Sequence, residues 1–85
     1  MESTQKTYSI GDTSRITGVT KRSLRGWEGL HIPFPERIVC GERAYRRYSP
    51  VQVRLISRIK EYLEHGYTLK KASEMAREEC KVRLN

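Results

Sequence analysis

The feature that most limits the fold of this sequence is a pair of short helical segments separated by a tight turn at Gly18. Ser9 is a favourable N-cap, and Asp12 follows it where a carboxylate stabilises the start of a helix. Gly18 is expected to end this first segment in the left-handed conformation. Thr20 then caps a second segment that runs from Lys21 to about Gly29. Helices this short need tertiary packing, and two of them joined by a glycine turn predict a helix-turn-helix.

The second of these segments has one apolar and one basic side. Leu24 and Trp27 lie three residues apart and are expected to face the core together. Lys21, Arg25 and Glu28 fall on another side of the helix, with Arg22 beside them, and the three cations remain for an outside partner.

Residues 30–48 lose the helical period. Pro33 and Pro35 exclude a helix, and two β-prone runs, 37–40 and 43–48, surround Gly41 and Glu42. This pattern predicts a short hairpin directly after the helix-turn-helix, which is the position of a wing.

Two further helices follow the hairpin. Ser49-Pro50 is an N-cap followed by proline at the first helical position, and Gly66 is expected to end that helix. Thr68 caps a fourth helix. We therefore predict a mainly α, winged helix-turn-helix fold of four helices and a small two-stranded hairpin, spanning 8–80 between flexible ends at 1–7 and 81–85. The expected core residues are Ile10, Val19, Leu24, Trp27, Leu55, Ile56, Ile59 and Leu63.

The charge of the chain favours a polyanionic partner. Seventeen Lys and Arg against ten Asp and Glu give a net charge of +7, which points first to nucleic acid and second to an anionic membrane surface. No apolar run approaches the roughly 18 residues of a spanning helix. We therefore expect a cytoplasmic protein that does not enter a membrane.

Enzymatic and metal chemistry find little support in the sequence. Cys40 and Cys80 are forty residues apart and lack the spacing of a zinc site, so free thiols are expected. His31 and His65 are isolated, and no nucleophile–base or paired-carboxylate arrangement is visible. We expect no enzyme, no metal and no cofactor.

Three stretches carry a resemblance to a known family. The opening run Tyr8–Glu28 contains Ser-Ile-Gly-Asp, Ile-Thr-Gly-Val-Thr and Leu-Arg-Gly-Trp-Glu, and Ala44–Ser49 reads Ala-Tyr-Arg-Arg-Tyr-Ser. Together with Leu55–Leu69, their order and spacing resemble the DNA-binding domain of the mercury-resistance-regulator (MerR) family over about residues 8–76.

That resemblance implies a second helix that enters the major groove and a wing that grips the flanking DNA backbone. By position, the arginine and tyrosine that contact phosphates from the wing are Arg46 and Tyr45. The chain departs from the family where Thr13 replaces a usual Leu. It departs again where Gly26 replaces a usual aromatic residue that contacts the DNA backbone. Residues 1–85 hold no counterpart of the family's long dimerisation helix or effector region, so neither property is carried over.

The proposed contacts follow from side-chain chemistry. Arginine suits the two acceptors of guanine, which makes Arg25 and Lys21 candidates for base contacts and Arg22 a candidate for a phosphate. Alternatives stay open in the wing. Arg46 could pair with Glu28 and hold the wing against the second helix, and the same holds for Arg47. Tyr45 could be a cross-strand packing partner, and Arg43 could enter a minor groove or stay in solvent. The candidate DNA-binding residues are Arg15, Thr20, Lys21, Arg22, Arg25, Arg43, Tyr45, Arg46 and Arg47.

Three functions compete. The first is a transcriptional regulator that reads a specific site on double-stranded DNA in a bacterial or phage setting, at the nucleoid. The second is a phage excisionase or another DNA-bending factor. The third, from a different class, is a protein-interaction module. We expect a monomer in solution, with a second copy recruited on a repeated half-site. The module's contact face on the fourth helix would be Leu69, Ala72, Met75, Ala76 and Cys80.

Overall fold

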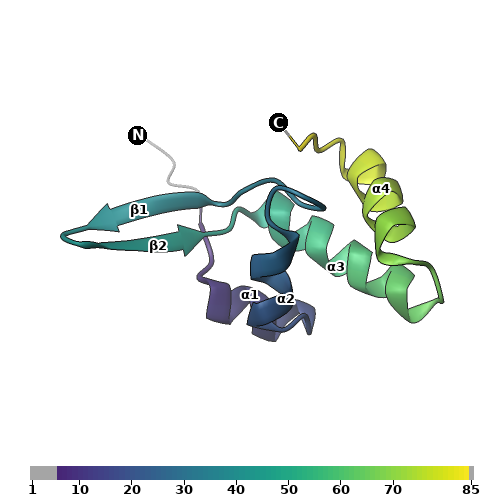
Figure 1. Cartoon of the computed structure of the whole chain (residues 1–85), viewed down its shortest axis with the longest axis horizontal. Coiled ribbons are helices and arrows are strands. Elements are labelled where there is room, and N and C mark those ends of the chain that lie inside the picture. Colours follow the sequence, from purple (N-terminus) through teal and green to yellow (C-terminus); the bar gives the residue numbers. More distant parts are fainter. Residues whose placement is uncertain (1–5, 85) are drawn as a thin grey trace.

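The computed structural model describes residues 6–84. It contains four helices and one antiparallel hairpin, so the predicted mainly α, winged helix-turn-helix architecture is confirmed (Figure 1). Within the described residues no helix is long and apolar enough to cross a membrane. The elements, in chain order, are α1 (Ile10–Thr17), α2 (Lys21–Trp27), β1 (Glu36–Cys40), β2 (Arg43–Arg47), α3 (Pro50–Glu64) and α4 (Leu69–Cys80).

The turn between α1 and α2 forms as the local sequence predicts. The Ser9 hydroxyl accepts the Asp12 N–H, and Gly18 ends α1 with a φ of 79°. The Thr20 hydroxyl accepts the Ser23 N–H at the start of α2. These contacts satisfy backbone donors that a helix N-terminus would otherwise leave unpaired.

The second helix is shorter than predicted. It ends at Trp27, and Glu28 is its C-cap. The carbonyl of Trp27 accepts the N–H groups of Leu30, His31 and Ile32, which closes the chain into a tight turn. This turn replaces the two further helical residues, Glu28 and Gly29, that the sequence predicted.

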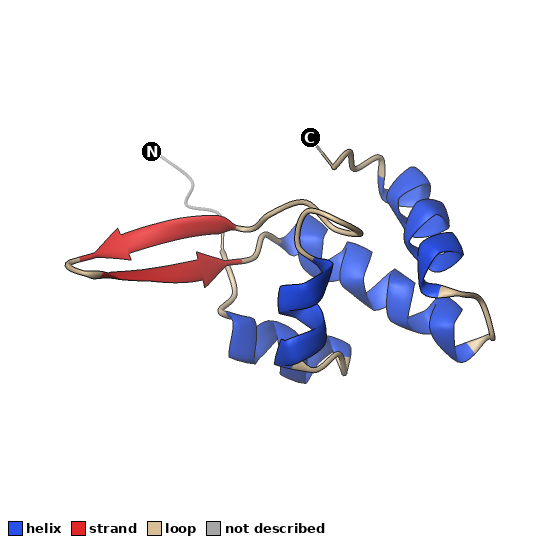
Figure 2. Ribbon diagram, viewed as in Figure 1, coloured by secondary structure: helices blue, strands red, loops and turns tan. Residues whose placement is uncertain are grey.

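The hairpin of β1 and β2, which we call the wing, extends away from the helices as an isolated ribbon (Figure 2). Cys40 pairs with Arg43 across a two-residue turn in which Gly41 has a φ of 65°. Tyr48 was expected in the second strand. It instead exchanges two backbone hydrogen bonds with Tyr8, of 2.7 and 2.8 Å.

The third helix is the centre of the fold. Ser49 and Gln52 form a reciprocal capping box ahead of it, and Pro50 occupies its first turn. It packs against α4 on one side and α1 on the other (Figure 1). This arrangement lets one helix organise both the helix-turn-helix and the C-terminal half of the domain.

The core contains most of the expected residues and four unexpected ones, of which Ala72 and Ala76 come from α4. Ile10 and Leu63 are partly buried and pack against the edge of the core. Ile32 and Tyr48 are fully buried although neither was expected there. The confirmed core residues are Val19, Leu24, Trp27, Leu55, Ile56 and Ile59.

Thr13 places a polar group inside this core. Its side chain is fully buried, and its hydroxyl has no hydrogen-bond partner. An unsatisfied buried hydroxyl costs roughly 1–3 kcal/mol. The buried hydroxyl of Thr13 therefore reduces the stability that the burial of α1 contributes.

The packed part of the chain reaches slightly beyond 8–80. Thr7 accepts a hydrogen bond of 3.0 Å from Arg47 Nε. Lys81 ends α4 with a φ of 56°, and Val82 packs against the core. Residues 1–5 and 85 lie outside the described part of the chain.

Candidate nucleic-acid interface

Three cations form the outer side of α2, which we call the basic face: Lys21, Arg22 and Arg25. All three side chains are exposed. Within residues 6–84, none of them has an acidic side chain in ion-pair range. Charges that are exposed and uncompensated in this way are available to an anionic ligand.

Two neighbours of the basic face influence its shape. The Lys21 side chain runs beside the first turn of α1, where its Cε lies 3.7 Å from the position that a Cβ on Gly11 would take. Gly26 is exposed, and nothing lies within 4 Å of the position for its Cβ. The basic face therefore carries an open gap at residue 26.

Two candidate DNA-binding residues beside α2 already have partners. The Thr20 hydroxyl accepts the Ser23 N–H and donates to Ser23 Oγ over 3.0 Å. Arg15 Nη2 lies 2.6 Å from Asp12 Oδ1 on the exposed surface of α1. Hydrogen bonds from Arg15, and then from Ser9, lower the pKa of Asp12, so this carboxylate offsets the charge of Arg15.

The wing presents different groups on its two faces. Tyr45 is 48% exposed and lies opposite Ile38, which is 50% exposed. Because successive side chains of a strand point to opposite faces, Tyr45 and Arg46 leave the hairpin on different sides. Arg43 is exposed beside the turn and has no ion pair within the described chain.

Arg46 and Arg47 are bound within the protein. Arg46 Nε donates to Glu28 Oε2 over 2.5 Å, so the alternative pairing considered for Arg46 is present. The hydrogen bond to Glu28 is the main reason why the pKa of Arg46 is raised. Arg47 donates to both the hydroxyl and the carbonyl oxygen of Thr7, each over 3.0 Å.

Glu28 does not lie exposed beside Lys21 and Arg25, where the spacing placed it, but makes the pairing with Arg46 that was considered as an alternative. Its side chain is only 5% exposed, at the point where α2 ends. The Tyr48 hydroxyl donates to the same oxygen as Arg46, over 3.2 Å, and Arg37 Nη2 lies 3.9 Å from the other oxygen. Burial, and then the charge of Glu28, raises the pKa of Tyr48. A Glu at the end of a basic helix suggests an ion pair. The sequence does not identify all of its partners, because they lie 9–20 residues away.

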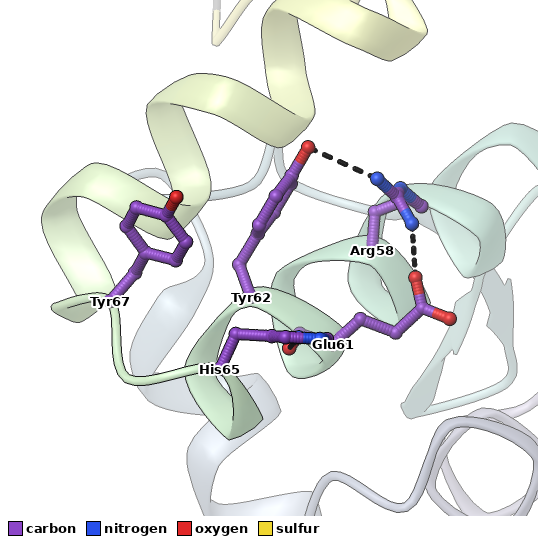
Figure 3. Close-up of a pocket in the computed structure, with 5 residues that line it drawn as sticks. All are labelled: Arg58, Glu61, Tyr62, His65 and Tyr67. Carbon is purple, nitrogen blue, oxygen red and sulfur yellow. Dashed lines mark hydrogen bonds and ion pairs between the residues drawn. The ribbon is translucent and has the colours of Figure 1, made fainter.

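A cavity lies elsewhere, at the C-terminal end of α3 (Figure 3). It has a volume of about 340 Å³, and none of its lining residues belongs to α1, α2 or the wing. Arg58 is hydrogen-bonded to Glu61, to the Tyr62 hydroxyl and to Glu79, whose pKa it lowers. The charges around this cavity satisfy one another. Its lining residues are Arg58, Glu61, Tyr62, His65 and Tyr67.

The proposed interaction face of α4 is occupied within the chain. Ala72 and Ala76 are fully buried in the core, and Leu69 and Cys80 pack against it. Ala72 and Ala76 are therefore not available to a partner, and their assignment to a contact face was wrong; Leu69, Met75 and Cys80 are partly buried. The periodicity that suggested a docking face reflects packing against α3.

The described residues offer no metal site, because no three His, Cys, Asp or Glu side chains among them lie close enough to hold an ion. Cys40 and Cys80 are free.

The excess positive charge lies in the part of the chain that contains the helix-turn-helix and the wing. Residues 1–60 carry twelve Lys and Arg against five acids, whereas 61–85 carry five of each.

A helix-turn-helix that is followed by an antiparallel hairpin defines the winged class of DNA-binding domains. The sequence matches the family described as MerR HTH family regulatory protein over residues 8–79. The chain therefore belongs to the MerR family of helix-turn-helix regulatory proteins, as the resemblance indicated, and this family supports a DNA-binding regulator. Among curated proteins, none matches the chain.

Proposed function

We propose that the chain recognises a specific double-stranded DNA site as a transcriptional regulator, with α2 in the major groove and the wing on the flanking backbone. The observation that carries this proposal is the basic face, whose three exposed cations have no acidic partner within residues 6–84. Uncompensated cations gain most from phosphates because their binding releases condensed counterions.

Within this interface, Arg25 and Lys21 are the proposed base-reading residues. The guanidinium of Arg25 can donate two parallel hydrogen bonds to guanine, worth about 1–3 kcal/mol of discrimination. Arg22 is proposed to bind a phosphate. Leu24 and Trp27 hold the opposite side of α2 in the core, which fixes the direction of the three cations.

In the wing, Arg43 and Tyr45 are the proposed backbone contacts. Both are exposed, and both lie on the face of the hairpin opposite to Arg46. Arg47 shares that face, but two of its donors are bound to Thr7. Arg15 adds less than its charge suggests because Asp12 compensates it.

Selection of binding sites from random duplex DNA tests the proposal. We expect an enriched half-site with guanine at the positions that Arg25 and Lys21 read. Arg25→Gln should relax the choice of base at one position, whereas Arg83→Gln, an exposed arginine after α4, should leave the selected sequence unchanged. Enrichment of no sequence at all, or the same sequence for Arg25→Gln, would contradict the assignment.

The genomic position of the selected site separates the regulator from the DNA-bending alternative. Sites at promoters support regulation, and clustered sites beside a recombination site support an excisionase. We further propose that the free protein is a monomer and that two copies gain affinity by occupying repeated half-sites. A tight dimer in sedimentation without DNA would overturn the monomer.

A further inference from the structure

The residues that join the wing to α2 centre on a single buried carboxylate. Glu28 is the C-cap of α2, and its two oxygens face different strands of the hairpin. Oε2 accepts from Arg46 on β2 over 2.5 Å, and Oε1 lies 3.9 Å from Arg37 Nη2 on β1.

Arg37 and Arg46 are direct partners in the register of the hairpin. Like charges that lie directly opposite each other destabilise a strand pair. Here a carboxylate from another element lies beside both guanidinium groups. The negative charge of Glu28 therefore offsets the repulsion between the two arginines, one on each strand.

We infer that Glu28 is a positioning residue that fixes the wing on α2, and that Arg46 is a strut inside the protein rather than a ligand of DNA phosphate. The inference rests on the proposed function only where DNA affinity is the measured quantity. It differs from the role that the family resemblance gives to Arg46.

The burial of the site supports this role. The Glu28 side chain is 5% exposed and that of Arg46 is 25% exposed, so both are largely withdrawn from solvent. A buried carboxylate requires partners, and the fully buried Tyr48 supplies a third, through its hydroxyl. Tyr48 also connects the end of the wing to Tyr8 through two backbone hydrogen bonds.

The surrounding charge makes Glu28 difficult to replace. Arg37 and Arg46 lie against it, and the charge of Arg25 is close enough to oppose the rise in the pKa of Tyr48. Without the carboxylate, cations of α2 and of both strands would face one another. The wing would then lose its fixed orientation relative to α2. Arg43 and Tyr45 would no longer be held at a constant position relative to the basic face.

A double-mutant cycle on DNA affinity tests the strut. Glu28→Gln removes a negative charge, so a purely electrostatic effect would strengthen binding to DNA. We expect the opposite, a weakening of about tenfold, which lies within the range of coupled neighbours. Arg46→Met should weaken binding to a similar degree, and the double variant should be no weaker than either single variant. Additive losses, or tighter binding by Glu28→Gln, would overturn the inference.

Glu42→Gln is the matched control because Glu42 is an exposed acid in the turn of the same hairpin. It should bind DNA as well as the parent chain or slightly better. Thermal unfolding of each variant identifies a general loss of structure. If Glu28→Gln unfolds, the comparison of Arg46→Met with Arg37→Met remains: both should weaken DNA binding, and equal affinity of Arg46→Met and the parent chain would contradict the strut.

A measurement without DNA separates this inference from the proposed function. Residual dipolar couplings of backbone amides report the orientation of the wing relative to α2 in the free protein. We expect one fixed orientation in the parent chain and averaged couplings in Arg46→Met. Unchanged couplings would refute the strut even if DNA binding were established, and averaged couplings would support it even if DNA binding failed.

Discussion

Replacement of Thr13 by valine should stabilise the domain. Thr13 is fully buried, and its hydroxyl has no hydrogen-bond partner. Valine keeps the branched shape and nearly the same helix propensity, so the main change is removal of a hydroxyl whose burial costs roughly 1–3 kcal/mol. We expect the free energy of unfolding to rise by about 1–2 kcal/mol. In a domain of this size each kcal/mol raises Tm by about 4–8 °C.

Thr17 supplies a matched control on the same face of α1. Its hydroxyl donates to the Thr13 carbonyl over 2.7 Å and accepts the Val19 N–H over 3.2 Å. Thr17→Val makes the same chemical change but should destabilise the domain by about 1–3 kcal/mol, because it leaves a buried N–H unpaired. Urea unfolding followed by circular dichroism measures both. Effects of the same sign, or no gain from Thr13→Val, would refute this reasoning.

Three further predictions concern two glycines and a histidine. Gly26→Ala should stabilise the domain by about 0.5–1 kcal/mol, since its Cβ meets nothing within 4 Å. Gly29→Ala should destabilise it, because Gly29 has a φ of 77° and a Cβ would come within 2.5 Å of the Phe34 ring; urea unfolding that gives the two variants the same sign would contradict both. Burial, and then the charge of Arg77, lowers the pKa of His31 below 6.5. Folding thus disfavours protonated His31, and stability should fall as the pH drops through 6.5. His31→Gln should flatten this part of the stability curve, and an unchanged pH profile would exclude the contribution of His31.

Features set by neighbouring residues could be predicted from the sequence. Ser9, Thr20 and Ser49 each cap a helix through a backbone N–H three residues further on, so the helix starts depend on local chemistry. The glycine turns at Gly18 and Gly41 have the same local origin. The order of the helices and the wing could therefore be predicted correctly from the sequence.

Features set by distant contacts could not be predicted in the same way. Tyr48 is buried because it reaches Glu28 and pairs with Tyr8, contacts that span 20 and 40 residues. The burial of Ile32 could not be predicted from periodicity, because it lies in an irregular turn outside any helix or strand. The partners of Arg46 and Arg47 depend on the same long-range packing. The basic face was predictable because amphipathic spacing alone separates it from Leu24 and Trp27.

The central claim is that the basic face of α2 and the wing bind double-stranded DNA. Titration of the labelled protein with duplex DNA at low salt, followed by amide chemical shifts, tests it most directly. We predict the largest shifts at 21–26 and 43–45, and little change at the cavity residues Arg58 and Tyr67. Unchanged shifts in α2 and the wing, or changes confined to that cavity, would contradict the account.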